Sequence, residues 1–274
     1  MNNKNLLHLV CGASGGVGSS WFAKLLIETY RTLNLTYFVI DTDESALDVD
    51  QAYNPDYYSP TKVAEYQEYV RIMKKENKYF RGRKQIHFLA ETIDDRCLPE
   101  EIIGFAYEKD TIVNIPSKVN KISNKWIQQD CLEIGKDDVK TICWFVATPI
   151  SRSIQELKKL YDYHDGHLKI ILVKNNLFGC EGDWNLAIDN EIEEFLNCAD
   201  ILQIEIGYLK LMPSLYEQNR VFNDNYPALF ELLDSQDDRL TDDLKGELSW
   251  YLRMATEAIV STGLLPSFKL EAKI

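Results

Sequence analysis

A short segment near the N-terminus combines glycine and serine in a pattern that suits phosphate binding. Residues 12–20 read GASGGVGSS, with serine at Ser14, Ser19 and Ser20. Glycine lets the backbone approach a phosphate closely and turn several N–H groups toward it, and a helix that starts here adds its positive end. The segment predicts a phosphate-binding loop, with a purely structural tight turn as the alternative.

The loop lies between elements that the hydrophobic pattern predicts. The apolar run Leu6–Cys11 indicates a buried strand, and the apolar spacing over Ser20–Tyr30 indicates a helix. Thr36–Ile40 is a second β-type run, and Asp41 ends it. Strand, glycine loop, helix and strand form a βαβ unit.

The rest of the chain continues this alternation of strands and helices. Further strands are predicted at Ile86–Leu89, Thr111–Ile115, Thr141–Ala147, Leu168–Val173 and Ile201–Ile206. Further helices are predicted at Thr61–Tyr79, Leu98–Tyr107, Ser153–Tyr163, Asn190–Asn197 and Asp242–Thr262. The pattern predicts an α/β fold with a mostly parallel sheet and helices on both faces. We expect a single domain over residues 1–274, with an inserted helical segment at about 55–84.

Composition restricts the partners. The chain has 274 residues and a formal net charge of -13, so nucleic acid and anionic lipid repel it at long range. A basic segment, Arg71–Lys84, is the exception; we expect a solvated helix face there, with DNA phosphates or an acidic partner as the alternative. The six cysteines form no CxxC pair, which favours reduced core thiols and a cytoplasmic protein. We expect neither a signal peptide nor a membrane-binding segment.

Two families use glycine loops of this kind. GASGGVG resembles the loop of short-chain dehydrogenases, in which Asp41 would take the position of the ribose-binding acid. That family carries a YxxxK pair near the middle of the domain, whereas the pair here, Tyr58 and Lys62, comes too early. About 45 residues also separate Asp41 from the next predicted strand, which is long for that family. An NAD(P)-binding oxidoreductase is therefore the alternative hypothesis.

The second resemblance covers most of the chain. Gly15, Gly16, Val17, Gly18 and Ser20 match the deviant Walker A loop of the ParA/MinD family of P-loop ATPases, while Ser14 and Ser19 replace its two lysines. Three later segments are similar to the family's pattern: VIDTDES with Asp41 and Asp43, TIVNIPS with Asn114 in place of the Walker B aspartate, and IILVKNN with Asn175. The likeness is greatest to the plasmid mobilisation and stability proteins of the MobD, StbB and TraL types. It implies a P-loop NTPase-like three-layer sandwich.

The resemblance also implies a ligand and residue roles. ATP or ADP with Mg²⁺ would be bound by residues 14–21, which end at Trp21, and Asn175 would lie near the adenine. Ser20 would bind Mg²⁺, Asp41 would support the metal directly or through water, and Asp43 would orient the attacking water. The alternative for both aspartates is a simple turn after a strand.

The replaced residues predict a degenerate ATPase. Loss of a charge-assisted phosphate contact at Ser19 should cost roughly 1.5–3 kcal/mol, and Asn114 removes a carboxylate near the metal. We expect weak nucleotide binding and slow or absent hydrolysis. The protein would act through a partner in plasmid mobilisation, partition or DNA positioning, with a homodimer as the family's form. A scaffold that has lost its ligand is the third hypothesis.

Smaller features are expected to be structural. Lys24 and Arg31 should lie on the solvated face of the helix after the loop. His164 and His167 have HxxH spacing, for which we expect turn polarity, with a metal site as the alternative.

Overall fold

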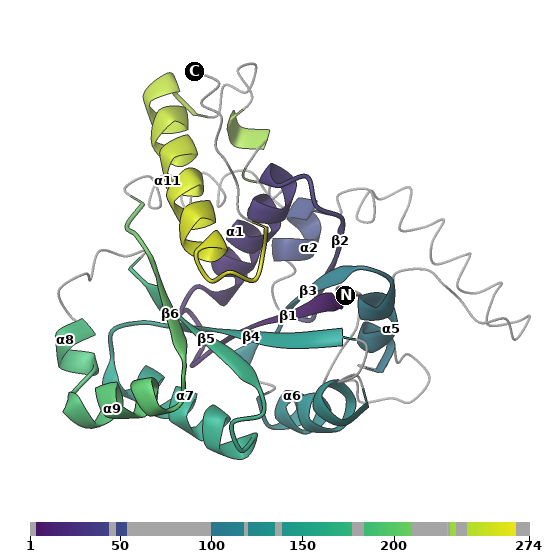
Figure 1. Ribbon diagram of the computed structural model, residues 1–274. Coiled ribbons are helices and arrows are strands. Elements are labelled where there is room, and N and C mark those ends of the chain that lie inside the picture. The colour runs from purple at the N-terminus through teal and green to yellow at the C-terminus, as the bar shows by residue number, and fades with distance from the viewer. Residues whose placement is uncertain are drawn as a thin grey trace, which may run out of the picture.

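The computed structural model describes residues 4–43, 48–53, 100–117, 120–134, 139–176, 184–209, 229, 231–233 and 240–266. Within these ranges six strands form one parallel sheet in the order β2-β3-β1-β4-β5-β6 (Figure 1). The strands are β1 (Asn5–Gly12), β2 (Tyr37–Asp41), β3 (Asp110–Asn114), β4 (Val139–Ala147), β5 (Lys169–Asn175) and β6 (Leu202–Ile206). The connections reverse direction around β1, which places the loop after β1 at a position where α/β sheets bind ligands.

Helices connect the strands. They are α1 (Ser19–Thr32), α2 (Asp48–Tyr53), α5 (Glu100–Glu108), α6 (Asn120–Trp126), α7 (Ser151–Tyr163), α8 (Trp184–Ala187), α9 (Asn190–Cys198) and α11 (Asp242–Val260), with a short 3₁₀ turn at Glu231–Leu233. Each predicted strand and helix within the described ranges is present, with its ends shifted by at most two residues. The predicted elements Thr61–Tyr79 and Ile86–Leu89, the inserted segment at 55–84 and the basic segment Arg71–Lys84 lie outside the described residues.

The helices cover both faces of the sheet and make three layers (Figure 1). One core joins α1, α2 and α11 to the sheet face that carries Val10 and Trp144. The other joins α5, α6, α7, α8 and α9 to the face that carries Leu7 and Leu9. Successive residues of a strand point to opposite faces, so β1 is apolar on both sides because both sides are covered. The predicted three-layer α/β sandwich is confirmed.

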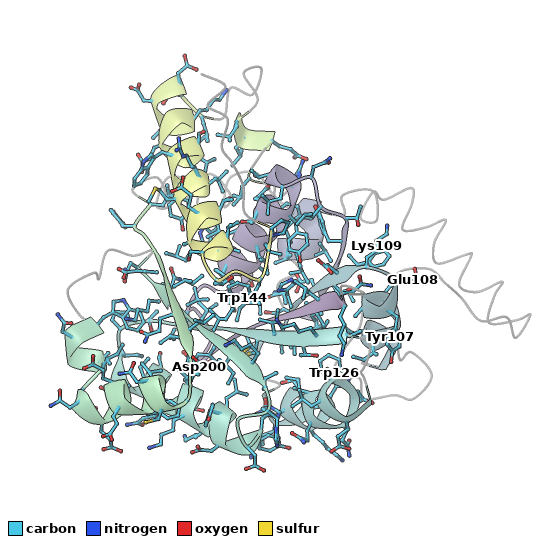
Figure 2. The ribbon with its side chains drawn as sticks, in the orientation of Figure 1. Tyr107, Glu108, Lys109, Trp126, Trp144 and Asp200 are labelled. Carbon is cyan, nitrogen blue, oxygen red and sulfur yellow. The ribbon has the colours of Figure 1, made fainter. Side chains whose placement is uncertain are left out.

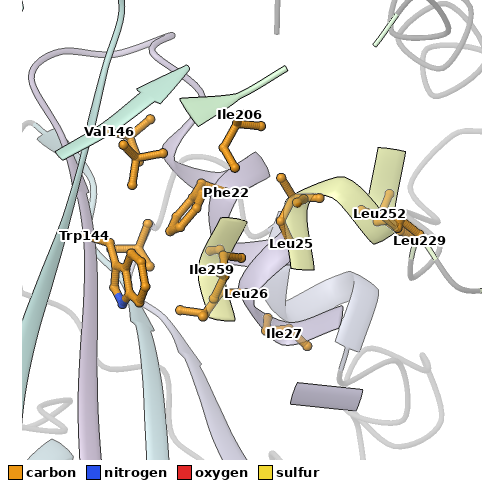
Figure 3. Close-up of a cluster of buried hydrophobic side chains, with 14 of the residues drawn as sticks. Phe22, Leu25, Leu26, Ile27, Trp144, Val146, Ile206, Leu229, Leu252 and Ile259 are labelled. Carbon is orange, nitrogen blue, oxygen red and sulfur yellow. The ribbon is translucent and has the colours of Figure 1, made fainter. Parts of the chain in front are cut away.

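The first core is built around α1. Figure 3 shows Phe22 of α1 beside Trp144 of β4, with Ile259 of α11 near Leu26. The ring centroids of Phe22 and Trp144 are 5.4 Å apart, and Trp144 lies in the interior of the molecule (Figure 2). Helix α1 is therefore held between the sheet and α11, which fixes where its first turn lies.

The burial of α1 corrects one expectation. Lys24 was expected on a solvated face, but its side chain is only 7% exposed. The solvated face is narrow because α2 and α11 both pack against α1 in addition to the sheet. Arg31 is exposed as predicted, and it pairs with Glu28 at 3.7 Å.

A π-helical segment at Ile127–Ile134 extends α6 and was not predicted. Gln128, Gln129 and Asp130 break the apolar spacing there, so the 3.6-residue pattern that reveals a helix is absent.

Candidate functional site

The glycine loop lies at the carboxyl end of β1 and leads directly into α1. Gly16 and Gly18 have φ angles of 81° and 90°, a left-handed conformation that glycine adopts without strain. Gly18 is the N-cap of α1 and has no side chain to bond to the helix start, and the Phe22 N–H bonds to the Gly18 carbonyl at 2.9 Å. The backbone N–H groups of Ser19, Ser20 and Trp21 precede that first intrahelical bond and lie at the positive end of the helix. No acidic residue lies in this first turn, so the helix start suits an anion.

Neighbouring strands hold the loop in this shape. Asn175, at the end of β5, donates a hydrogen bond from Nδ2 to the Val17 carbonyl at 2.7 Å. A Cβ atom on Gly18 would lie 2.4 Å from that Nδ2, and one on Gly12 would lie 2.4 Å from Val17 Cγ2. Glycine is thus required at both positions by close approach. Asn175 lies beneath the loop, and its proximity to an adenine stays a prediction.

Three polar side chains from three elements meet beside the loop. Asn114, at the end of β3, donates from Nδ2 to Ser20 Oγ at 3.2 Å and to Asp41 Oδ1 at 2.9 Å. Sheet register explains the meeting, because Asn114 is the register partner of Asp41 on β2 and of Val10 on β1. We call Ser20, Asn114 and Asp41 the amide cluster. The sequence singled out all three residues but did not show that the asparagine bridges the other two.

Asp41 is engaged by the backbone as well. Its Oδ1 accepts from the Asp43 N–H and its Oδ2 from the Val49 N–H, both at 3.1 Å. The Thr42 hydroxyl and N–H both bond to the Asn114 carbonyl, at 2.7 and 3.1 Å. Asp41 is only 4% exposed, and its carboxylate joins Asp43, just after β2, to Val49 in α2. The predicted catalytic residue Asp43 lies two residues after the end of β2, half-buried.

The other predicted binding residues surround the same loop. Ser14, Gly15 and Gly16 are exposed at its tip, Val17 is buried, and Ser19 is half-buried. The Trp21 indole points to the C-terminal helix, where its Nε1 donates to Tyr251 Oη at 3.0 Å. A contribution of Trp21 to ligand binding would therefore come from its backbone N–H.

The amide cluster fits Mg²⁺ poorly. Mg²⁺ takes near-octahedral oxygen ligands, and in proteins it is held through one or two carboxylates together with phosphate and water. Both oxygens of Asp41 already accept backbone N–H groups, and Ser20 Oγ already accepts from Asn114. The oxygen atoms of Ser20 and Asp41, which were predicted to bind the metal, thus already accept hydrogen bonds from other groups of the protein.

A buried hydrogen-bonded chain runs from β4 through β1 and α1 to the first residue of β3. Trp144 Nε1 donates to His8 Nδ1 at 2.9 Å, so His8 carries its hydrogen on Nε2 and donates it to Tyr30 Oη at 2.7 Å. Tyr30 in turn donates to Asp110 Oδ2 at 2.8 Å. Burial lowers the pKa of His8 to about 3, and burial together with the Asp110 charge raises the pKa of Tyr30 well above its ordinary value. Sequence patterns gave no sign of this chain, because His8 stands alone in an apolar run.

Two further polar features lie outside the loop. Cys11 and Cys143 place their Sγ atoms 3.3 Å apart on β1 and β4, and both are free thiols. His164 is buried and bonds through Nδ1 to Gln128 Oε1 at 3.1 Å, whereas His167 is exposed. The HxxH pair was expected to consist of polar residues of a surface turn. His167 fits this expectation, whereas His164 is a buried residue. The described residues contain no group of three side chains able to hold a metal ion.

Comparison with known proteins gives structural neighbours at low identity. A MinD cell division protein from Aquifex aeolicus is 13% identical, with a TM-score of 0.48, over 96% of this chain and 100% of the other. A plasmid partition protein from Borrelia burgdorferi bound to AMPPNP is 15% identical, with a TM-score of 0.44, over 93% and 99% of the two chains. A nucleotide-binding protein from Archaeoglobus fulgidus in complex with ADP is 13% identical, with a TM-score of 0.43, over 81% and 90%. No protein-family model matches the sequence, and no curated protein matches it significantly. Because these values are low, we infer function from the residues of the site itself.

Among the residues that the structure describes, no helix combines the length and the apolar character that a bilayer-spanning segment needs.

Proposed function

We propose that this protein binds the phosphates of a nucleotide in the loop at residues 13–20 and hydrolyses ATP slowly or not at all. One observation carries the proposal: the N–H groups of Ser19, Ser20 and Trp21, which precede the first intrahelical bond of α1, adjoin a glycine loop at the carboxyl edge of a parallel sheet. In this proposal the N–H groups of the helix start and of the glycine backbone bind the anion.

The hydrolysis part of the proposal rests on which groups are neutral. Ser14 and Ser19 stand where the ParA/MinD pattern has lysines, and Asn114 stands where it has an aspartate. Fixed charges contribute most to catalysis where they stabilise the charge that develops on phosphate in the transition state. A site that offers only hydroxyls and backbone N–H groups at these positions should still bind phosphate, but it should stabilise the transition state of hydrolysis weakly.

The biological role follows from the motif resemblance. A ParA/MinD-like protein with a slow site would work by binding a partner protein in plasmid mobilisation, partition or DNA positioning. A homodimer is included in this proposal, although Ser14 lacks the charge through which the family's signature lysine reaches across its dimer.

Ligand titration tests the proposal directly. ADP or ATP should raise the melting temperature, because a ligand of the folded state stabilises it by RT ln(1 + [L]/Kd). A shift with NADH alone would favour the oxidoreductase, and no shift with any of the three would favour a scaffold without a ligand. Turnover of ATP at the rate of an active ParA protein would refute the slow-site part.

A pair of glycine variants locates the binding. Gly18→Ala places a Cβ against Asn175 at a left-handed backbone position, so it should abolish the ADP-dependent shift. Gly104→Ala in α5 adds a Cβ in open space and should leave the shift unchanged. Equal shifts in both variants would place the ligand elsewhere.

A further inference from the structure

We infer that phosphate binding at this loop does not depend on Mg²⁺, and that Ser20 serves as a hydrogen-bond donor to phosphate instead of as a metal ligand. The inference rests on the proposed nucleotide binding. It follows from the direction of the hydrogen bonds in the amide cluster.

The orientation of the Asn114 amide is set by Asp41. Nδ2 lies 2.9 Å from the Asp41 carboxylate oxygen Oδ1, and the flipped amide would place two acceptors against each other there. The second N–H of the same nitrogen then points to Ser20 Oγ at 3.2 Å. Ser20 is therefore the acceptor in this contact.

This direction decides what the Ser20 hydroxyl offers a ligand. An aspartate at position 114 would accept the Ser20 hydrogen and leave both lone pairs of Oγ for a cation. Asn114 does the opposite: it occupies a lone pair and leaves the hydroxyl hydrogen without a role inside the cluster. A hydroxyl hydrogen beside the free N–H groups of the first turn of α1 suits a phosphate oxygen.

The rest of the cluster leaves little for a divalent cation. Asp41 accepts three N–H groups, from Asp43, Val49 and Asn114, and releasing them would undo the turn into α2. Asn114 Oδ1 is buried without a hydrogen-bond partner among the described residues. That single neutral oxygen can accept from a water molecule, but it supplies no charge to hold Mg²⁺.

Isothermal titration of ADP into the full chain, in excess MgCl₂ and in EDTA, tests the inference. The wild-type Kd should agree within about twofold between the two conditions. Asn114→Asp should create a dependence on Mg²⁺, with ADP binding at least about tenfold tighter in MgCl₂ than in EDTA. Asn34→Asp adds the same charge at an exposed left-handed position after α1, where aspartate is tolerated, and should behave as wild type.

A second variant keeps the test valid if Asn114→Asp does not fold. Ser20→Ala should weaken ADP binding by the same factor with and without Mg²⁺, because a donor to phosphate is lost. A loss confined to MgCl₂ would identify Ser20 as a metal ligand and overturn the inference. Wild-type binding that requires Mg²⁺ would overturn the inference but leave nucleotide binding standing, whereas no ADP binding in either condition would overturn both.

Discussion

Replacing His8 with glutamine tests the buried hydrogen-bonded chain from Trp144 to Asp110, and the expected effect is a change in how stability depends on pH. In the folded protein the pKa of His8 is lowered from 6.5 to about 3 by burial. Below pH 6.5 the unfolded chain therefore takes up a proton that the folded protein does not bind. The free energy of unfolding must fall as the pH falls through this range.

The magnitude follows from the two pKa values. One pKa unit corresponds to about 1.4 kcal/mol, so His8 should remove about 2 kcal/mol of stability between pH 7 and pH 5. His8→Gln removes this titration, and it also leaves the Trp144 N–H without its acceptor, which should lower stability at pH 7 by about 1–3 kcal/mol. The variant should be less stable at pH 7 but lose about 2 kcal/mol less than wild type on acidification.

Urea unfolding followed by circular dichroism at a series of pH values measures both effects. His167→Gln is the matched control, since it makes the same substitution at an exposed position in the turn after α7. Carboxylates also titrate in this range, which is why the difference between variants is the quantity to compare. An unchanged pH dependence in His8→Gln would refute the reasoning, because it would mean that His8 titrates equally in both states.

Three other outcomes are expected. Phe22→Ala removes a ring that packs on Trp144 between α1 and the sheet, and should cost about 3–5 kcal/mol of stability in urea unfolding; a loss near zero would contradict the packing in Figure 3. Asp41→Asn keeps one acceptor oxygen, which suits the two N–H groups at Oδ1, and turns its NH₂ toward the Val49 N–H; it should cost about 1–3 kcal/mol and increase hydrogen exchange at Val49. Unchanged exchange there would show that Asp41 does not hold the Val49 N–H. Thr241→Ala removes the side-chain cap of α11 and should lower stability by about 1 kcal/mol, which glycine at the same position should largely restore.

The sequence was most informative where one local signal determines the structure. The apolar run Leu6–Cys11, the glycine loop and the helix after it were predicted because each depends on neighbouring residues alone. The strands β4 and β5 were predicted for the same reason, since each is a long apolar run.

The features that were missed depend on residues far apart in the chain. The bridge made by Asn114 requires β3 to lie between β1 and β2, and the order of strands in a sheet cannot be predicted from any single segment of the sequence. Lys24 is buried on a helix that α2 and α11 cover in addition to the sheet. His8 finds its partner Trp144 on β4, more than 100 residues away. In each case the tertiary neighbour, and not the local pattern, sets the chemistry of the side chain.

The contact between Trp21 and Tyr251 links the first turn of α1 to the C-terminal helix. A ligand that draws the N–H groups of this turn toward its phosphates would also move the indole that bonds to Tyr251. Trp21 is therefore a fluorophore next to the proposed phosphate loop, and it is one of five tryptophans in the chain. A change in emission on ADP addition that is lost in Trp21→Phe would report occupancy of the loop without any label, and replacement of Tyr251 by phenylalanine would show how far the C-terminal helix takes part in the response.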